Sequence, residues 1–280
     1  MSSRNPILWR LALAKRAKRA ERSNPRQDRN RTPNDYGRPS DSRYSRNRGG
    51  DSRNNVIELP TFKRAKKRTV EIVPRNVNQE DLVFALADDS QHIVFATGPA
   101  GCGKTLISTL AAIKALKSGE VEKIVITRPN VAVDDKDIGF LPGDILKKMT
   151  PWMMPILDVF AEYFDSGEIQ AMLEENIIEM VPIAFIRGRT FKNAFIIVDE
   201  AQGTTANSML SILTRIGENS KMVVTGDLAQ SDRGTENGLA DFLKRFEKSN
   251  HITVIQFEKG DVERHPVVKE LLGIYKDKDV

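Results

Sequence analysis

From residue 70 onward, short apolar runs alternate with longer segments in which apolar residues recur every three or four positions. A short apolar run is typical of a strand buried on both faces, and the wider spacing is typical of a helix with one buried face. We expect strands at residues 93–97, 123–127, 195–198, 221–225 and 252–255, and helices at 104–117, 207–216, 238–247 and 266–275. This alternation predicts an α/β domain with a doubly wound, mostly parallel sheet.

Residues 130–190 interrupt the alternation. The stretch contains four prolines and shows no regular periodicity. We expect a helix from Pro151 to Phe164, because proline is favoured in the first turn of a helix, and a second helix at about residues 169–175. The stretch is therefore interpreted as a helical and loop insertion between two core strands.

Charge divides the chain into two parts. Residues 1–68 hold 20 Lys or Arg against 6 Asp or Glu, a balance of +14, whereas residues 69–280 hold 23 against 32, a balance of −9. Residues 15–68 carry too few apolar side chains to offset the entropy of ordering, so residues 1–68 are predicted to be a disordered basic tail before a folded domain at 69–280. Basic tails attract polyanions without sequence preference, which makes RNA or single-stranded DNA an expected partner; a tail that only solubilises the domain is the alternative.

The number of cysteines and the hydropathy of the chain indicate the cellular compartment of the protein. Cys102 is the only cysteine, so an intrachain disulfide and a zinc site built on paired cysteines are both excluded. No apolar run approaches the roughly 18–20 residues that span a bilayer. The apolar residues 7–14 precede the basic stretch, which is the reverse of a signal peptide. These features predict a cytoplasmic protein with no membrane partner.

The strongest motif follows the first expected strand and opens the first expected helix. It fits the pattern G-x-x-x-x-G-K-[ST], the Walker A motif or P-loop, in full. Its residues are Gly98, Pro99, Ala100, Gly101, Cys102, Gly103, Lys104 and Thr105. Such a loop turns backbone N–H groups and a helix N-terminus toward phosphate oxygens, with Lys104 reaching the β and γ phosphates and the Thr105 hydroxyl ligating Mg²⁺. The motif predicts binding of ATP with Mg²⁺; a chance match in a turn is disfavoured by the flanking strand and helix.

A second motif ends the strand at residues 195–198 with Asp199 and Glu200. An apolar strand followed by aspartate is the Walker B arrangement, in which Asp199 holds the Mg²⁺ shell. The neighbouring Glu200 is then placed to polarise the attacking water. Two acids after a strand are weak evidence alone, but together with the P-loop they indicate hydrolysis.

The strand at residues 221–225 leads into a third polar segment, which ends at Gln230. Gln230 is the candidate sensor of the γ-phosphate, whereas Asp227 is equally well explained as a residue that shapes the turn.

Three arginines are further candidates for the catalytic site. Arg264, Arg187 and Arg128 are each able to supply positive charge to the transition state, in cis or from a neighbouring subunit, with Arg264 and Arg187 as the preferred pair. Surface arginines are more often simply solvated.

Several short strings occur together with the P-loop in a fixed order. They are Thr127-Arg-Pro129, Gly139-Phe-Leu-Pro-Gly-Asp144, Arg187-Gly-Arg-Thr190, Val198-Asp-Glu-Ala-Gln202, Gly226-Asp227 with Gln230, and Asp261-Val-Glu-Arg-His-Pro266. With these strings the chain resembles the PhoH family of P-loop ATPases over about residues 74–276. The short, tailed form is what a bacteriophage-encoded member would have.

The resemblance implies a single RecA-like domain related to the core of superfamily 1 helicases, ATP hydrolysis, a homo-oligomeric ring such as a hexamer, and a link to RNA. By analogy with a helicase Q motif it implies that Gln79 contacts adenine. The chain departs from the family at Gly203, at Ser231–Gly234 and at Glu263. These departures leave the phosphate site intact and concern how the ATP state is relayed to a partner.

Two other function classes are compatible with a P-loop. One is a small-molecule kinase, which the adjacent Asp199 and Glu200 disfavour, and the other is a nucleic-acid-binding module in which ATP is only a switch. A translocating superfamily 1 helicase normally uses two RecA-like domains, and residues 69–280 accommodate one. Helicase activity would therefore require neighbouring subunits.

Overall fold

The computed structural model describes residues 69–129, 142–231, 237–264, 267–268 and 270, with the backbone alone described for residues 142–148. All of these lie within one compact unit, residues 57–280. The basic tail at residues 1–68 and most of the helix expected at 266–275 lie outside the described residues. The division of the chain into a tail and a folded domain therefore stays a prediction.

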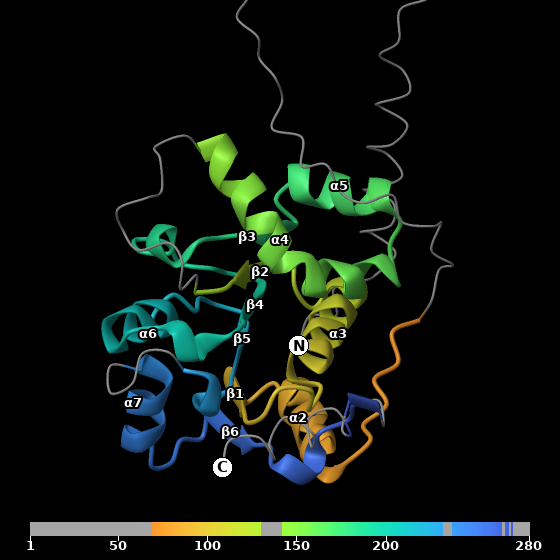
Figure 1. Cartoon of the computed structure of the whole chain (residues 1–280). Coiled ribbons are helices and arrows are strands. Elements are labelled where there is room, and N and C mark those ends of the chain that lie inside the picture. The colour runs from red at the N-terminus through yellow and green to blue at the C-terminus, as the bar shows by residue number, and fades with distance from the viewer. Residues whose placement is uncertain (1–68, 130–141, 232–236, 265–266, 269, 271–280) are drawn as a thin grey trace, which may run out of the picture. The chain divides into compact units, whose positions relative to one another are not determined.

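A six-stranded sheet in which every paired strand is parallel forms the centre of the domain (Figure 1). Its order is β3-β2-β4-β5-β1-β6. The strands are β1 (Ile93–Thr97), β2 (Lys123–Thr127), β3 (Ile178–Met180), β4 (Ala194–Val198), β5 (Lys221–Gly226) and β6 (Ile252–Gln256). Strands β1 and β4 are buried along their whole length, as expected for a parallel sheet covered on both faces. The predicted α/β architecture is confirmed.

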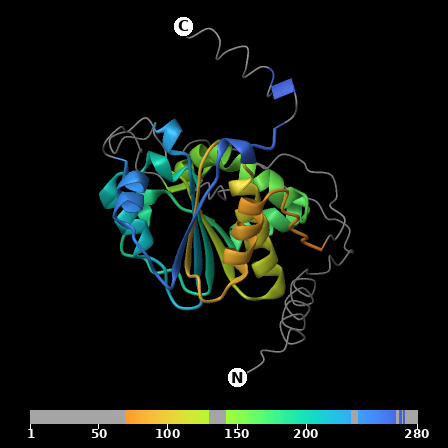
Figure 2. The ribbon, with the colours of Figure 1, turned by 90° about the horizontal axis from the view of Figure 1, so that it is seen from below.

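Helices cover both faces of this sheet (Figure 2). The α-helices are α2 (Val77–Ala87), α3 (Lys104–Ser118), α4 (Pro142–Ala161), α5 (Ser166–Glu174), α6 (Ala206–Leu213) and α7 (Gly238–Arg245), and the 3-10 helices are η2 (Ile183–Phe185), η3 (Ala201–Gly203), η4 (Leu228–Gln230) and η6 (Lys259–Asp261). Helices α2, α3 and α4 contribute to one apolar cluster, and α6 and α7 contribute to the other. Successive residues of a strand face opposite sides, so Ile197 belongs to the first cluster and Ile196 to the second.

The insertion differs from the expectation in two ways. It contributes β3, a sixth strand that pairs with β2 and places Ile178 beside Ile124. Its first helix begins at Pro142, not at Pro151, and carries Pro151 and Pro155 in its interior. An interior proline costs about 3 kcal/mol. Burial of one face of α4 offsets that cost, through Met149, Met153, Ile156, Leu157 and Phe160.

Helices α6 and α7 begin within a residue of the expected positions and end earlier. Each start is fixed by a side-chain cap: Thr205 accepts from the backbone N–H of Ser208, and Asn237 accepts from two backbone N–H groups of α7. Helix α6 stops at Leu213 because Ile216 instead forms a parallel bridge with Phe191.

No helix in the part of the chain that the structure describes is long and apolar enough to cross a membrane.

The strand order brings the chemical motifs to one edge of the sheet. Strand β5 lies between β1 and β4, and β2 lies on the far side of β4. At their carboxyl ends, β1 leads into the P-loop, β2 into Arg128, β4 into Asp199 and β5 into Asp227. Ligands of open α/β sheets bind in the crevice at this edge, so the fold itself assembles the candidate site.

Candidate functional site

The P-loop follows β1 in a conformation that requires glycine. Gly98 has φ 138°, and a Cβ there would lie 2.4 Å from the carbonyl oxygen of Phe257. Gly103, with φ 82°, is the N-cap of α3 and offers no side chain to its first turn. The first N–H groups of α3 are therefore left free of a side-chain cap, in the arrangement that binds anions at helix N-termini.

Lys104, the first residue of α3, is buried beneath this loop. Its Nζ donates to the carbonyl oxygens of Gly98, at 2.6 Å, and Pro99, at 2.7 Å. Burial lowers the pKa of the Lys104 ammonium, and the nearby carboxylates Asp227, Glu200 and Asp199 counter that effect. The loop thus holds a positive charge at its centre. By contrast, burial raises the pKa of the Cys102 thiol, whose side chain packs in the apolar core.

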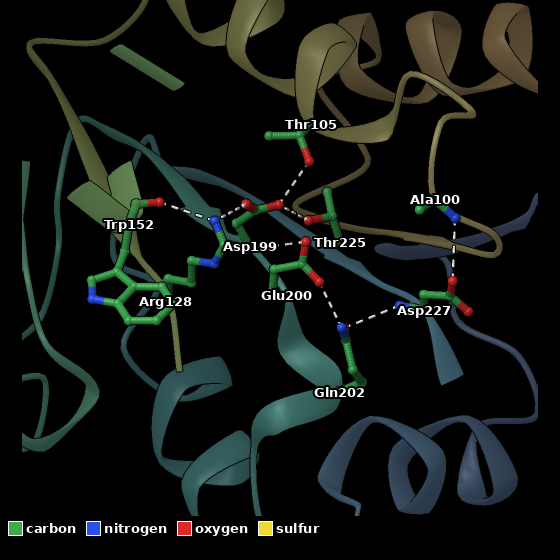
Figure 3. A network of polar contacts seen from close by, with 9 residues as sticks. All are labelled: Ala100, Thr105, Arg128, Trp152, Asp199, Glu200, Gln202, Thr225 and Asp227. Atoms are coloured by element: carbon green, nitrogen blue, oxygen red, sulfur yellow. Dashed lines mark hydrogen bonds and ion pairs between the residues drawn. The ribbon is translucent and has the colours of Figure 1, made fainter. Parts of the chain in front are cut away.

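Asp199 joins the P-loop helix to two strands. Its Oδ1 accepts hydrogen bonds from the hydroxyls of Thr105, at 2.8 Å, and Thr225, at 2.6 Å, and the residue is almost fully buried (Figure 3). Carboxylate and hydroxyl oxygens are ligands that Mg²⁺ prefers. Within the described ranges no group of three or more His, Cys, Asp or Glu forms a metal cage. This donor set fits a Mg²⁺ ion held by one or two protein oxygens together with phosphate, as Mg²⁺ usually is in phosphate-binding sites.

Glu200 adopts a left-handed backbone conformation, with φ 55° and ψ 42°. The other non-glycine residues with positive φ in the described part of the chain are all asparagines, which tolerate this region. For glutamate it costs roughly 1–3 kcal/mol, and such strain clusters at functional sites. Both oxygens of the carboxylate have neighbours: Oε2 accepts from Gln202 Nε2 at 2.6 Å, and Oε1 lies 3.4 Å from Arg128 Nη2.

A chain of hydrogen bonds continues from Glu200 to the P-loop (Figure 3). Gln202 Oε1 accepts from the backbone N–H of Asp227 at 3.0 Å, and Asp227 Oδ2 accepts from the N–H of Ala100 at 3.2 Å. Asp227 Oδ1 also caps η4 through the N–H of Ala229. Asp227 therefore shapes its turn, one of the interpretations left open by the sequence, and in addition holds the P-loop. The sequence shows Gln202 only as part of a family string, although its place two residues after Glu200 is a usable signal.

A cleft of about 600 Å³, including its open mouth, is lined by the P-loop and these acids. Thr105, Asp199, Glu200 and Gln230 all line it. Gln230 stands on η4 with its side chain exposed, as a sensor of bound phosphate would need. The structure thus brings together the Walker A, Walker B and sensor candidates.

Two further candidates contact the P-loop from outside. Arg264 donates from Nη2 to the carbonyl oxygen of Ala100 at 3.1 Å. The buried Gln79 donates from Nε2 to Cys102 O at 3.0 Å, and its Oε1 accepts from Arg75 N at 2.9 Å. The Gln79 amide therefore bonds the P-loop at its Nε2 end and the backbone just before α2 at its Oε1 end, and its contact with adenine stays a prediction.

Arg187 is not brought to this cleft. It lies in the connection that returns from β3 to the start of β4, its side chain is exposed, and it is not among the residues that line the cleft. That position does not support a contribution to the site of the same subunit. Arg128, at the end of β2, lies beside both acids instead.

Comparison with known proteins identifies the family. The family described as PhoH-like protein matches residues 71–276. The chain is 39% identical over 244 residues to Protein PhoH of Escherichia coli (strain K12), covering 84% of this chain and 68% of that protein. It is 37% identical over 222 residues to the PhoH-like protein of Bacillus subtilis (strain 168), covering 79% and 68%.

Among solved structures, the Sulfolobus solfataricus SWI2/SNF2 ATPase core in complex with dsDNA overlaps 59% of this chain and 34% of its own. Its TM-score is 0.37 and its identity 14%. A likeness this slight carries no argument about function, so the assignment depends on the family match and on the site. With its P-loop at the carboxyl edge of a parallel sheet, the chain has the α/β fold predicted from its sequence and belongs to the PhoH-like protein family.

Proposed function

We propose that the protein binds ATP with Mg²⁺ in this cleft and hydrolyses it. The observation that carries the proposal is the position of Glu200. Its carboxylate lines the cleft next to Asp199 and close to the P-loop, where water attacking a γ-phosphate would arrive. A kinase requires the phosphoryl acceptor to take that place, whereas a hydrolase requires a base for water.

Each residue of the cleft then has a role. The P-loop N–H groups and Lys104 bind the β and γ phosphates, and Thr105 and Asp199 hold Mg²⁺, which neutralises developing charge when bound. Glu200 orients the water and takes its proton. Gln230 lines the cleft and is assigned to the γ-phosphate. Arg264 is the arginine of the same subunit that lies against the loop.

The first test measures inorganic phosphate released from ATP in the absence of any acceptor. We expect release that is linear in time and is lost when EDTA removes Mg²⁺, because the charge neutralisation in the cleft needs the ion. A small-molecule kinase would instead release phosphate only at a trace rate without its acceptor. Phosphate release that persists unchanged in EDTA would contradict the Mg²⁺ assignment.

The proposed activity takes place on or with nucleic acid, RNA or single-stranded DNA. The support is electrostatic: residues 1–68 carry a balance of +14 in a chain whose remainder carries −9. Lys and Arg that neutralise phosphates release counterions, which makes affinity fall steeply with salt.

Affinity for a single-stranded RNA and a single-stranded DNA is to be measured across a salt series, for the full chain and for residues 69–280. We expect removal of the tail to weaken binding and to flatten the dependence of log affinity on log salt, since every phosphate that the protein no longer neutralises reduces that slope by roughly 0.7–0.9. The ATPase rate of the two forms, with and without nucleic acid, shows whether binding is coupled to hydrolysis. An unchanged slope would place the nucleic-acid contacts in the folded domain, and an absence of binding by both forms would contradict the proposed partner.

The assembly is proposed to be a homo-oligomeric ring such as a hexamer. The exposed Arg187 would then be available to a neighbouring subunit's cleft. Molecular mass in solution, measured by light scattering with and without ATP, tests this assembly.

A further inference from the structure

Arg128 lies beside the two acids of the cleft, yet the proposed reaction assigns it no role. It follows β2 directly, and about a fifth of its side chain is exposed. Its Nη2 lies 3.4 Å from Glu200 Oε1, and its Nη1 lies 3.8 Å from Asp199 Oδ2. The same Nη1 donates to the carbonyl oxygen of Trp152 at 2.9 Å (Figure 3).

The third of these contacts reaches outside the cleft. Trp152 belongs to α4, the first helix of the insertion, and lies between Pro151 and Pro155. Prolines remove backbone donors from a helix and disturb the turn that precedes them. The guanidinium of Arg128 therefore joins the candidate base to a weakened turn of α4.

We propose that Arg128 is a positioning residue that ties Glu200 to helix α4, so that the placement of α4 sets the orientation of the base. This inference rests on the proposed function, because it assigns Glu200 as the base. Glu200 is held on two sides, by Arg128 at Oε1 and by Gln202 at Oε2, on a backbone that is itself strained. With one side released, the carboxylate is free to rotate away from the water.

The planar guanidinium of Arg128 contacts two partners at once. One guanidinium nitrogen faces Glu200 while the other bonds the Trp152 carbonyl. A lysine ammonium carries the same charge but is a single point on a flexible chain, and it does not span both partners in a fixed geometry. A charge effect of Arg128 on the substrate would survive in lysine, whereas the link to α4 would not.

The test is a double-mutant cycle of Arg128→Ala and Glu200→Gln, read as kcat and KM for ATP. We expect Arg128→Ala to lower kcat by about 10- to 100-fold with little change in KM, because misplacing a catalytic group costs rate. In the Glu200→Gln background we expect no further loss from Arg128→Ala, since the arginine acts through Glu200. Arg128→Lys should lower kcat nearly as much as alanine does. Arg245→Ala, which removes an exposed guanidinium paired with Asp241, is the matched control and should keep the wild-type rate.

A second readout does not depend on turnover. In a Trp9→Phe background Trp152 is the one remaining tryptophan, and about half of its side chain is exposed. We expect Mg·ATP to change its fluorescence when Arg128 is present and to leave it nearly unchanged in Arg128→Ala, with nucleotide binding checked separately by calorimetry. Equal fluorescence responses with and without Arg128, or no response to bound nucleotide in either form, would overturn the link to α4.

Other outcomes overturn the positioning role itself. They are a loss that is equally large in the Glu200→Gln background, a wild-type rate in Arg128→Lys, or a faster rate in Arg128→Ala. Failure of the proposed function is distinguishable from all of these, because it would show as absence of phosphate release by the unaltered protein.

Discussion

Replacing Glu200 by glutamine is expected to lower ATP turnover by about 10²- to 10⁴-fold while leaving ATP affinity nearly unchanged, the range typical for loss of a general base. Glutamine keeps the shape of glutamate and loses the proton-accepting carboxylate. The phosphate-binding groups are on other residues: Lys104 and Thr105 lie on α3, and Asp199 is bonded to Thr105 and Thr225. Binding should therefore be preserved when the chemical step is lost.

The measurement pairs steady-state phosphate release with calorimetric titration of Mg·ATP. Glu122→Gln is a suitable control, since Glu122 is an exposed glutamate just before β2 and its loss removes the same charge. Turnover by Glu200→Gln at the wild-type rate would show that the base is another group. A large loss of affinity would instead mean that Glu200 binds the nucleotide, and the assignment of a purely catalytic role would then be wrong.

The parts of the site that the sequence predicts well are those determined by short, contiguous stretches of residues. The P-loop is a contiguous motif whose glycines are required by backbone angles, as Gly98 and Gly103 show. Asp199 and Glu200 end a strand that is recognisable from its own apolar residues. Because parallel strands all end at the same edge of a sheet, two local patterns are enough to predict that the loop and the acids meet.

The parts that sequence does not predict depend on contacts between distant positions. The hydrogen bond between Ala100 N and Asp227 Oδ2 joins residues 127 positions apart, and neither residue type indicates in the sequence that the two are in contact. Arg128 is one of three arginine candidates, and nothing in its neighbours separates it from Arg187. Only the strand order, with β2 beside β4, places the first next to the acids and leaves the second in an exposed connection.

The insertion shows a different limit of prediction. Strand β3 has only three residues, Ile178–Met180, too few for periodicity to distinguish it from a loop. Prolines within α4 favour a helix boundary at Pro151, and the buried face of that helix outweighs the local preference. Tertiary packing decides both elements, and its contributions are not visible in a short window of sequence.

Replacing Lys104 by alanine is expected to weaken binding of Mg·ATP by roughly 30-fold to several thousand-fold, because truncating one member of a buried charge pair costs about 2–5 kcal/mol. In the structure the ammonium lies beneath the loop and donates to Gly98 and Pro99, whose carbonyls face the same centre. Among the residues that the structure describes, Lys104 is the only lysine or arginine that lines the cleft, and the nearby Arg128 and Arg264 already face Glu200 and the Ala100 carbonyl. Turnover should fall to background as well, since the same charge faces the γ-phosphate in the transition state.

Loss of binding must be separated from loss of fold. Lys104 is buried, and burial lowers its pKa, so the folded protein carries a desolvation cost at this position that alanine removes. We therefore expect the midpoint of thermal unfolding without nucleotide to change little, and the stabilisation that Mg·ATP gives the wild-type protein to disappear. Lys114→Ala, an exposed position on the same helix, controls for the loss of one positive charge and should keep the full nucleotide-dependent shift. If Lys104→Ala also keeps that shift, the nucleotide is held elsewhere, and the P-loop is not the phosphate site of this protein.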